Sequence, residues 1–515
     1  MQRERPTGGE QGSYERYLSK TTKEAGFTFS GRLFALVFGF AAQAVIARLL
    51  GSDLLGVYVL AWTVVMAVSL VTTFGFEGSF VRFIAMYVSR GEEDEARSVF
   101  SLGIRVGLLL SVVCTAAVIL LREPIARGIF KEPRLAPALL LIAVGILPYT
   151  LSRLAAAGLR ALKDMRSNIL AVEVWLRIFR LAAFLVLFAL GLRLMGLVAA
   201  IVFASGVSAV AAFAYLRRKG PFLLKGATRA TIPAREVLSY SAAMLGETGT
   251  AFALLHAGRL LLGVFMTSAE VGVYNIAVLL STMAMLFVYS FNAIFSPIVA
   301  DVYHGGNPAF MASLLRAITR WILLLTLPLY AWIVLCGEPV LGIFGPEFVA
   351  GYAALVILAT GQLLDSAASS VASCLAMTGY QRFNVYNTLA LAVVSVGLNI
   401  VLIPRFGIVG AAVATAVALV LANVARLIEG KFLLGVVPYD RSTIKAVVVG
   451  VVLMGAVLAA RSAGAVPGTW YWSAVLLVAC YGLAAGVTAL LGISDEDRVV
   501  VGTLLRRLTP RARRS

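Results

Sequence analysis

The stretch RLLGSDLLGVYVLA, residues 48–61, returns in the second half of the chain in recognisable form. Both copies share a serine, a glycine followed by valine and tyrosine, and an alanine: Ser52, Gly56, Val57, Tyr58 and Ala61 correspond to Ser268, Gly272, Val273, Tyr274 and Ala277. Each copy is a short polar break between two long apolar runs. Glycine permits a tight turn there, and tyrosine suits a membrane–water interface. The match predicts an internal duplication.

Further pairs keep nearly the same offset. They are Arg166 and Asn168 with Arg382 and Asn384, Gly196 with Gly410, and the pattern Glu123, Pro124, Ile129, Phe130 with Glu338, Pro339, Ile343, Phe344. A constant offset over most of a chain indicates duplication of a whole structural unit. We predict two homologous lobes, 27–216 and 236–434, joined by a basic linker, 217–235. Residues 435–492 have no counterpart in the repeat.

Composition assigns the chain to a membrane. Its 515 residues are 60% hydrophobic and 14% charged, whereas soluble domains carry about 25% charged residues. The apolar residues form continuous blocks of roughly 20, the length of a membrane-spanning helix, without the alternation of a β-barrel. We therefore predict an all-α integral membrane protein with fourteen transmembrane helices, arranged as two pseudo-symmetric six-helix lobes and two C-terminal helices. The predicted spans are 27–50, 55–88, 98–121, 136–160, 168–190, 193–216, 236–264, 271–300, 311–336, 351–378, 383–403, 408–434, 444–462 and 470–492.

The basic residues predict the orientation. The formal charge is +18, and Lys and Arg concentrate in the tail 1–26, in the linker 217–235 and in the tail 493–515. Because cytoplasmic segments are enriched in Lys and Arg, we expect both tails and the linker in the cytoplasm, where they can also contact anionic lipids. The basic residues form no run with interleaved aromatics, so a nucleic-acid partner is not expected.

Catalytic and metal-binding motifs are missing from the sequence. It contains no phosphate-binding glycine-rich loop and no nucleotide motif. The only histidines are His256 and His304, so zinc is unsupported. The cysteines lie in or beside apolar runs without a C-x-x-C pair: Cys114, Cys336, Cys374 and Cys480. We predict no enzyme activity, no metal and no cofactor.

Several stretches resemble the multidrug/oligosaccharidyl-lipid/polysaccharide exporter superfamily, and within it the polysaccharide transporter family of lipid-linked oligosaccharide flippases. They are ARLLGSDLLGVYVLA, FGFEGSFVRF, VGVYNIAVLLSTM, MTGYQRFN and NIVLIPRFGIVGAAVATAVA. The resemblance covers about 27–434. It implies two six-helix lobes around a central cavity that opens alternately to each side. The duplication independently suggests a site between pseudo-symmetric bundles.

Basic residues inside the apolar spans are the candidate substrate-binding groups, because charges at this depth are costly unless they face protein or water. They are Arg32, Arg177, Arg180, His256 and Arg259. Glu173, Arg177 and Arg180 share one helix face, and the alternative for the first two is simple mutual neutralisation. The guanidinium fork suits the oxygens of a pyrophosphate. For His256 the alternative is an ordinary buried histidine.

Three acids inside the spans are candidates for coupling transport to H⁺, to Na⁺ or to the membrane potential: Glu77, Glu247 and Asp365. Asp365 lies in the polar run GQLLDSAASS, which is too polar to face lipid. The segment GETGTAF around Glu247 is rich in small residues and predicts a hinge or a close helix contact. Arg426 and Glu429 are spaced for a local ion pair.

The resemblance implies a flippase that carries a polyprenyl-pyrophosphate-linked glycan across the cell membrane for polysaccharide biosynthesis, for example an O-antigen unit. The alternatives are a lipid II flippase, a drug/cation antiporter, and a membrane-embedded glycosyltransferase or polymerase, for which the short external loops leave little room. The sequence leaves the glycan, the coupling ion and the oligomeric state open, and a monomer is compatible with it.

Overall fold

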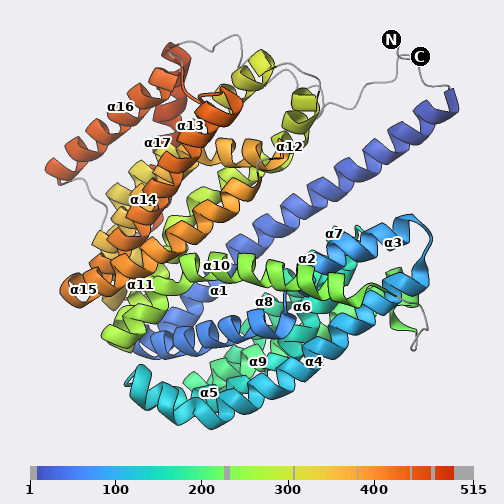
Figure 1. Ribbon diagram of the computed structural model, residues 1–515. Coiled ribbons are helices and arrows are strands. Elements are labelled where there is room, and N and C mark those ends of the chain that lie inside the picture. Colours follow the sequence, from blue (N-terminus) through green and yellow to red (C-terminus); the bar gives the residue numbers. More distant parts are fainter. Residues whose placement is uncertain are drawn as a thin grey trace. The chain divides into compact units, whose positions relative to one another are not determined.

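The computed structural model describes residues 8–225, 232–304, 308–379, 381–440, 443–464 and 470–491 (Figure 1). Regular structure within these ranges is helical throughout, with no strand. The prediction of an all-α membrane protein is confirmed. By their contacts, residues divide into two compact units: unit 1 is Met1–Leu50 with Val57–Gly249, and unit 2 is Gly51–Gly56 with Thr250–Ser515. The predicted lobes 27–216 and 236–434 stay predictions.

Unit 1 contains the N-terminal helices. They are α1 (Gly8–Thr73), α2 (Phe76–Ser79), the π-helix η1 (Phe80–Ile84), α3 (Ala85–Ser89), α4 (Glu93–Glu123), the π-helix η2 (Pro124–Ile129), α5 (Leu135–Ala143), α6 (Ile146–Ala161), α7 (Met165–Ile169), the π-helix η3 (Leu170–Trp175), α8 (Leu176–Ala189), α9 (Leu194–Lys219), the 3₁₀-helix η4 (Pro221–Leu224) and the first part of α10 (Ala234–Phe265). The linker is therefore partly helical, and residues 226–231 lie outside the described ranges.

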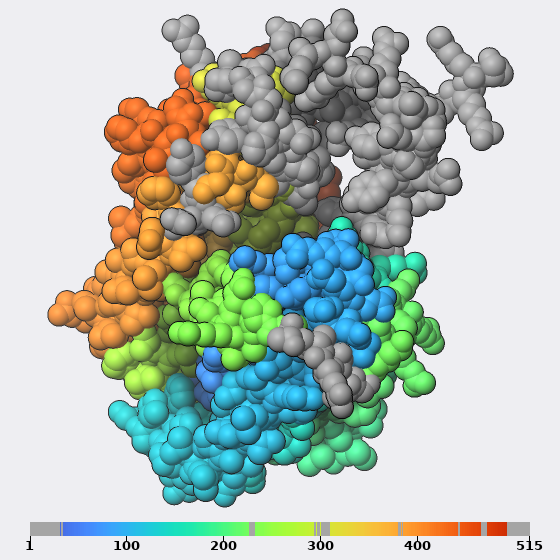
Figure 2. Space-filling model, turned by 45° about the vertical axis from the view of Figure 1, so that its right-hand side comes forward, coloured from blue at the N-terminus to red at the C-terminus, as the bar shows by residue number. Residues whose placement is uncertain are grey.

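The start of α10 packs closely on the turn after α1. Gly75 has φ 70°, and a Cβ there would lie 2.1 Å from the backbone oxygen of Ser241. Next to it, the hydroxyls of Ser79 and Ser241 are 2.6 Å apart. Only glycine tolerates both this backbone conformation and this approach. Figure 2 shows the result as the green surface of α10 beside the blue surface of the helices after α1.

Unit 2 contains the remaining helices. They are α11 (Ser268–Ser281), η5 (Thr282–Ala284), α12 (Met285–His304), α13 (Pro308–Gly342), η6 (Pro346–Gly351), α14 (Tyr352–Met377), α15 (Gln381–Leu434), α16 (Thr443–Ser462) and α17 (Trp470–Leu490). Helix α14 packs chiefly on α15, while α16 and α17 both pack on α13 (Figure 1). The Trp332 indole donates to the Ser473 carbonyl at 2.6 Å, which fixes α17 on α13. The predicted tail 493–515 is outside the described residues.

The number of spans differs from the sequence-based count. Ten of the described helices are long and apolar enough to cross a membrane, or eleven if the bent pair α5 and α6 is one span. The count is lower for three reasons. Helices α1 and α15 each extend over two predicted spans, the fourth predicted span is the bent pair α5 and α6, and the fifth is divided among α7, η3 and α8. Helices α1 and α15 are each kinked at a glycine with positive φ, Gly51 (φ 74°) and Gly407 (φ 55°). Both glycines lie between the predicted spans, and fourteen spans stays a prediction.

The two copies of the repeated turn contact each other inside unit 2. A Cβ on Gly56 would lie 1.7 Å from the Ser268 carbonyl oxygen, and a Cβ on Gly272 would lie 2.1 Å from the Ser52 carbonyl oxygen. Ser52 corresponds to Ser268, and Gly56 corresponds to Gly272. The contact is therefore reciprocal, as a local two-fold axis produces. Its closeness explains why both copies keep glycine at this position.

Candidate functional site

Two ion pairs of unit 1 converge on Glu77, at the start of α2. Arg153 Nε donates to Oε1 at 2.9 Å, and its Nη2 donates to Oε2 at 2.8 Å. Arg160 Nη2 donates to the same Oε2 at 2.9 Å. The two arginines are two turns apart on α6, so they lie on one helix face. One carboxylate thus holds two guanidiniums and leaves one positive charge in excess.

Buried packing on either side keeps α6 in place. The hydroxyls of Thr72 and Thr150 are 2.6 Å apart and join α1 to α6. The Tyr149 ring meets the edge of Trp62, with 5.2 Å between ring centres. Leu154 beside Arg153 is fully buried in the apolar core. Since this side of α6 is fixed, the adjacent guanidiniums are held in a defined orientation toward Glu77.

A second group of charges follows on η3 and α8. Glu173 and Arg177 form the predicted i,i+4 ion pair at 2.7 Å. Arg177 also lies against α1, because a Cβ on Gly39 would be 3.5 Å from its Nε. Arg180, one turn further, has a buried Nε with no hydrogen-bond partner among the described residues. Of the two predicted arginines on this face, Arg180 is the one with a buried donor, Nε, that lacks a partner in the described part of the chain.

These two groups form one cluster. Glu173 interacts electrostatically with Arg153 as well as with Arg177, and Arg177 with Arg180. We call the set the arginine cluster: Glu77, Arg153, Arg160, Glu173, Arg177 and Arg180. Four arginines against two glutamates leave a net charge of +2. The π-helix η1 begins three residues after Glu77, and the π-helix η3 includes Glu173. Turns of π-helix occur frequently at functional sites.

The predicted pair on α10 forms a separate polar site in unit 2. Arg259 Nε donates to Asn275 Oδ1 at 3.0 Å, and its Nη1 lies 3.1 Å from His256 Nδ1. The His256 ring stacks on Phe252, with 4.5 Å between ring centres. The contacts of Arg259 in the described part of the chain are therefore with neutral groups, and its charge is not neutralised by a carboxylate there.

The three predicted coupling acids have different environments. Glu77 is held by two arginines, and Asp365 by Arg426 at 3.0 Å. Glu247 is exposed on α10. Glycines 246 and 249, which flank it, would meet nothing within 4 Å if they carried a Cβ. The hinge or close helix contact expected for this segment stays a prediction.

The local pair predicted between Arg426 and Glu429 is wrong. Arg426 binds Asp365 on α14, and Glu429 accepts two hydrogen bonds of 2.9 Å from Asn387 Nδ2. Arg426 and Glu429 each contact a partner on a neighbouring helix segment, because helix packing brings these partners closer than the i,i+3 spacing brings the two residues to each other. The side chain of Arg32, the remaining predicted residue, lies outside the described residues.

Sequence reasoning missed Arg153 and Arg160. The signal was present, because both interrupt the apolar run of the fourth predicted span seven positions apart. An intramembrane arginine is a functional candidate by default. Their common partner Glu77 could not be inferred, since it lies 76 and 83 residues away in the chain.

Replacing Glu77 by alanine is expected to destabilise the protein by about 3 kcal/mol, because two partly buried guanidiniums lose their common carboxylate. Glu173→Ala is the matched control. Its side chain is 39% exposed and forms a single i,i+4 pair, so we expect a loss of about 0.5 kcal/mol. Free energies of unfolding from SDS titration in mixed micelles give the comparison. Equal losses would show that Glu77 has no special structural role.

The chain is similar to several known proteins, among them a curated relative and solved membrane transporters. The probable low-salt glycan biosynthesis flippase Agl15 of Haloferax volcanii is 30% identical over 159 residues, which cover 31% of this chain and 34% of Agl15. The chain thus matches about a third of the length of that relative. A structure titled lipid II flippase MurJ, inward closed conformation, is similar with a TM-score of 0.71 and 11% identity, covering 93% of this chain and 99% of MurJ.

A multidrug resistance MATE family transporter of the MOP superfamily, in an inward-facing conformation, has a TM-score of 0.66 and 14% identity, covering 80% of this chain and 98% of that one. The resemblance to this superfamily predicted from the sequence is confirmed. The family model described as polysaccharide biosynthesis protein matches residues 45–350, more than half of the sequence. The chain therefore belongs to this family of polysaccharide biosynthesis proteins.

Proposed function

We propose that this chain is a flippase that moves a polyprenyl-diphosphate-linked oligosaccharide from the cytoplasmic to the external leaflet of the cell membrane. The observation that carries the proposal is the arginine cluster, whose net charge of +2 comes from four arginines and two glutamates. A diphosphate diester carries two negative charges. The cluster would neutralise them in a medium where an uncompensated charge is very costly.

The geometry of the guanidinium donors supports a phosphate group, which offers two oxygens at once, rather than a monatomic anion such as chloride. Arg180 has an unpaired Nε, and Arg160 binds Glu77 through one Nη only. Guanidiniums offer parallel N–H groups that match two phosphate oxygens at once. Arg32, Arg177 and Arg180 would bind the diphosphate, while the polyprenyl chain stays in the lipid.

In unit 2, His256 and Arg259 would contact the same substrate at another stage of transport. Within the described residues Arg259 contacts Asn275 and His256 and no acid, so a phosphate would not have to displace a carboxylate from among them. Alternation between two sets of contacts is the usual behaviour of transporters built from repeats.

Coupling to H⁺ or Na⁺ is assigned first to Glu247. Glu77 and Asp365 are each engaged by arginine, and a cation would have to compete with that partner. Glu247 is exposed on α10. Glu247→Gln is expected to remove any gradient dependence of transport when the vesicle assay below is run with an imposed H⁺ or Na⁺ gradient. The excess of Lys and Arg in residues 1–26, 217–235 and 493–515 supports cytoplasmic termini.

Two rival functions make different demands on the arginine cluster. A lipid II substrate would present the same diphosphate, and the MurJ-like fold is compatible with it. A drug/cation antiporter needs an acid to bind its cation, and within the arginine cluster Glu77 and Glu173 are both paired with arginines. The charge balance therefore favours an anionic lipid carrier.

The proposal is tested in proteoliposomes that contain a polyprenyl-diphosphate oligosaccharide with an NBD label on its glycan. Dithionite outside the vesicles quenches only outer-leaflet label. Protein-free vesicles should lose about half of the signal, and vesicles with the protein nearly all of it. The same assay with NBD-labelled lipid II tests the peptidoglycan alternative, and gradient-driven uptake of an ethidium-type cation, measured separately, tests the antiporter.

Quenching that stops at half in the presence of correctly inserted protein would overturn the flippase proposal. Faster movement of lipid II than of the oligosaccharide lipid would favour the peptidoglycan alternative. Gradient-driven cation uptake without lipid movement would favour the antiporter.

A further inference from the structure

Two aromatic side chains of unit 1 lie beside the arginine cluster, and we call them the aromatic pair: Trp62 of α1 and Tyr149 of α6. Their ring planes meet at 77°, with 5.2 Å between the ring centres. The hydroxyls of Thr72 and of Thr150, the residue after Tyr149, are 2.6 Å apart and join the same two helices. The packing of α1 on α6 therefore holds both rings in place.

Electrostatic interactions place the Tyr149 hydroxyl at the arginine cluster. It interacts with Arg153, Glu77 and Glu173. Tyr149 precedes Arg153 by one turn, so the two side chains share a face of α6. The Arg153 guanidinium is itself oriented by its two hydrogen bonds to Glu77. The aromatic pair is therefore continuous with the arginine cluster.

The aromatic pair and Arg153 present polar groups that a ligand can reach. Trp62 and Tyr149 are half-buried, and the side chain of Arg153 is 36% exposed. Within the described residues, the Trp62 indole N–H, the Tyr149 hydroxyl and Arg153 Nη1 make no hydrogen bond. None of the three belongs to the fully buried polar atoms that lack a partner. Their hydrogen bonds are therefore available to a bound molecule.

Tyr58, one turn before Trp62 on α1, differs from Tyr149 in access. It is 3% exposed, and its hydroxyl is fully buried with no partner in the described part of the chain. In the second copy of the repeat, the hydroxyl of the corresponding Tyr274 lies 3.1 Å from that of Thr415. Tyr58 and Tyr149 both carry an unpaired hydroxyl, but only that of Tyr149 can meet a ligand.

The chemistry of these groups restricts the ligand. An aromatic face is partly negative and can cover the apolar C–H face of a sugar ring. The indole N–H and the tyrosine hydroxyl match sugar hydroxyls, which both donate and accept. The guanidinium beside them matches phosphate oxygens. A sugar attached to a diphosphate presents a ring, hydroxyls and negative charge side by side, whereas a polyprenyl chain offers the donors no partner.

We propose that the aromatic pair binds the sugar that is attached directly to the diphosphate of the transported lipid. The assignment rests on the proposed flippase function, because the arginine cluster has to hold the diphosphate for this sugar to reach the pair. Trp62 covers the C–H face of the sugar, and the Tyr149 hydroxyl bonds to one of its hydroxyls. Selection of the first sugar then takes place in unit 1.

The test compares three lipids on protein reconstituted in nanodiscs: polyprenyl diphosphate esterified with glucose, with N-acetylglucosamine, or with methanol. All three carry two negative charges, and the methyl ester has no sugar. We expect wild-type protein to bind at least one sugar lipid about 25-fold more tightly than the methyl ester. One net hydrogen bond and one covered ring, at about fivefold each, give this preference.

Two variants remove one contribution each. Tyr149→Phe keeps the ring without the hydroxyl, and Trp62→Leu removes the larger ring. Each should retain a preference of about fivefold, with affinity for the methyl ester within about twofold of wild type.

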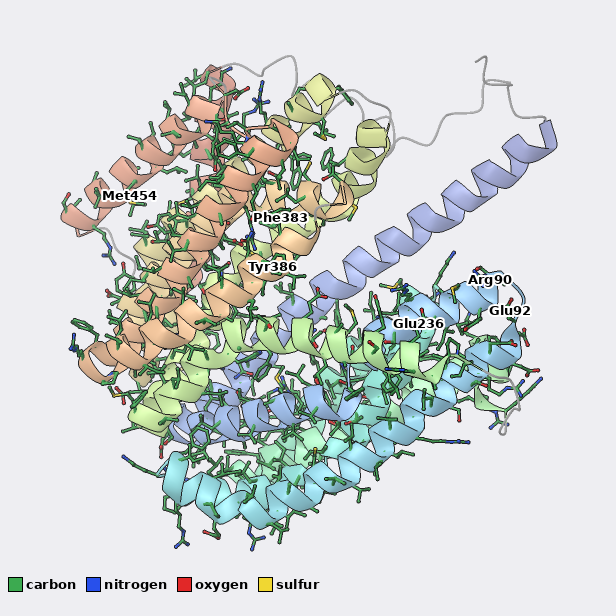
Figure 3. The ribbon with its side chains drawn as sticks, in the orientation of Figure 1. Arg90, Glu92, Glu236, Phe383, Tyr386 and Met454 are labelled. Carbon is green, nitrogen blue, oxygen red and sulfur yellow. The ribbon has the colours of Figure 1, made fainter. Side chains whose placement is uncertain are left out.

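Matched controls separate sugar binding from structural damage. Tyr58→Phe makes the same chemical change as Tyr149→Phe at a hydroxyl that a ligand cannot reach. Tyr386→Leu removes a ring that is 65% exposed on α15 of unit 2 (Figure 3). Both should keep the full preference of the wild-type protein.

The outcomes distinguish this proposal from the flippase proposal. Equal affinity of wild-type protein for the three lipids, or a full preference in both Tyr149→Phe and Trp62→Leu, overturns the sugar site. A loss in Tyr58→Phe equal to that in Tyr149→Phe also overturns it, because the effect would then come from packing. In each case, weaker binding of the methyl ester by Arg180→Ala still supports the flippase. Wild-type protein that binds none of the lipids overturns both proposals.

Discussion

Arg180→Ala is expected to reduce lipid transport about 100-fold while the protein still reaches the membrane in normal amounts. Arg180 is the member of the arginine cluster whose buried Nε has no hydrogen-bond partner in the described part of the chain, and we propose that its guanidinium binds the phosphate. Loss of two charge-assisted hydrogen bonds to a desolvated anion corresponds to about 3 kcal/mol, or two powers of ten. Since it lacks a protein partner at Nε, its removal should cost little stability.

A second substitution at the same position tests whether the geometry of the arginine side chain matters in addition to its charge. Arg180→Lys restores the charge without the planar fork, so we expect it to recover only part of the transport rate. The control is Arg127→Ala, because Arg127 is 70% exposed and pairs only with Glu123. The rate of dithionite quenching in vesicles, normalised to inserted protein, measures all three. Full transport by Arg180→Ala would mean that the diphosphate is bound elsewhere.

Gly272→Ala is expected to destabilise the protein by at least about 3 kcal/mol. The added Cβ would lie 2.1 Å from the Ser52 carbonyl oxygen. Because that atom belongs to the backbone, no side-chain rotation can relieve the overlap. Gly56→Ala should have a comparable effect through Ser268, whose oxygen would be 1.7 Å away. Either variant would have to break the close contact between the two repeated turns.

The reciprocity of this contact makes the prediction sharper. Both substitutions separate the same two backbones, so the double variant should lose less stability than the two single variants predict by addition. Gly397→Ala is the control, since a Cβ on this helical glycine would meet nothing within 4 Å, and it should stabilise slightly, by up to about 1 kcal/mol. SDS titration measures each. Gly272→Ala as stable as Gly397→Ala would refute the close crossing.

The sequence by itself determined the class of the protein and the order of its helices. Continuous apolar runs leave the backbone of a membrane segment no partner but itself, so a helix is the only local solution. The kinks at Gly51 and Gly407 were also visible, because the predicted breaks between spans contain them. The repeat showed which turns correspond. It could not show that Gly56 and Gly272 meet, which depends on how the two copies cross.

The ion pairs show the same difference between what the sequence predicts and what only the tertiary structure determines. Glu173 and Arg177 are joined by helix periodicity alone, and the sequence predicted that pair correctly. The same rule failed for Arg426 and Glu429, whose partners Asp365 and Asn387 lie 61 and 42 residues away. It also left Arg153 and Arg160 without a role. Periodicity fixes only which residues share a helix face, whereas the packing of one helix on another decides which face meets which. The partners of the intramembrane charges, and with them the two candidate sites, were therefore decided by the tertiary structure.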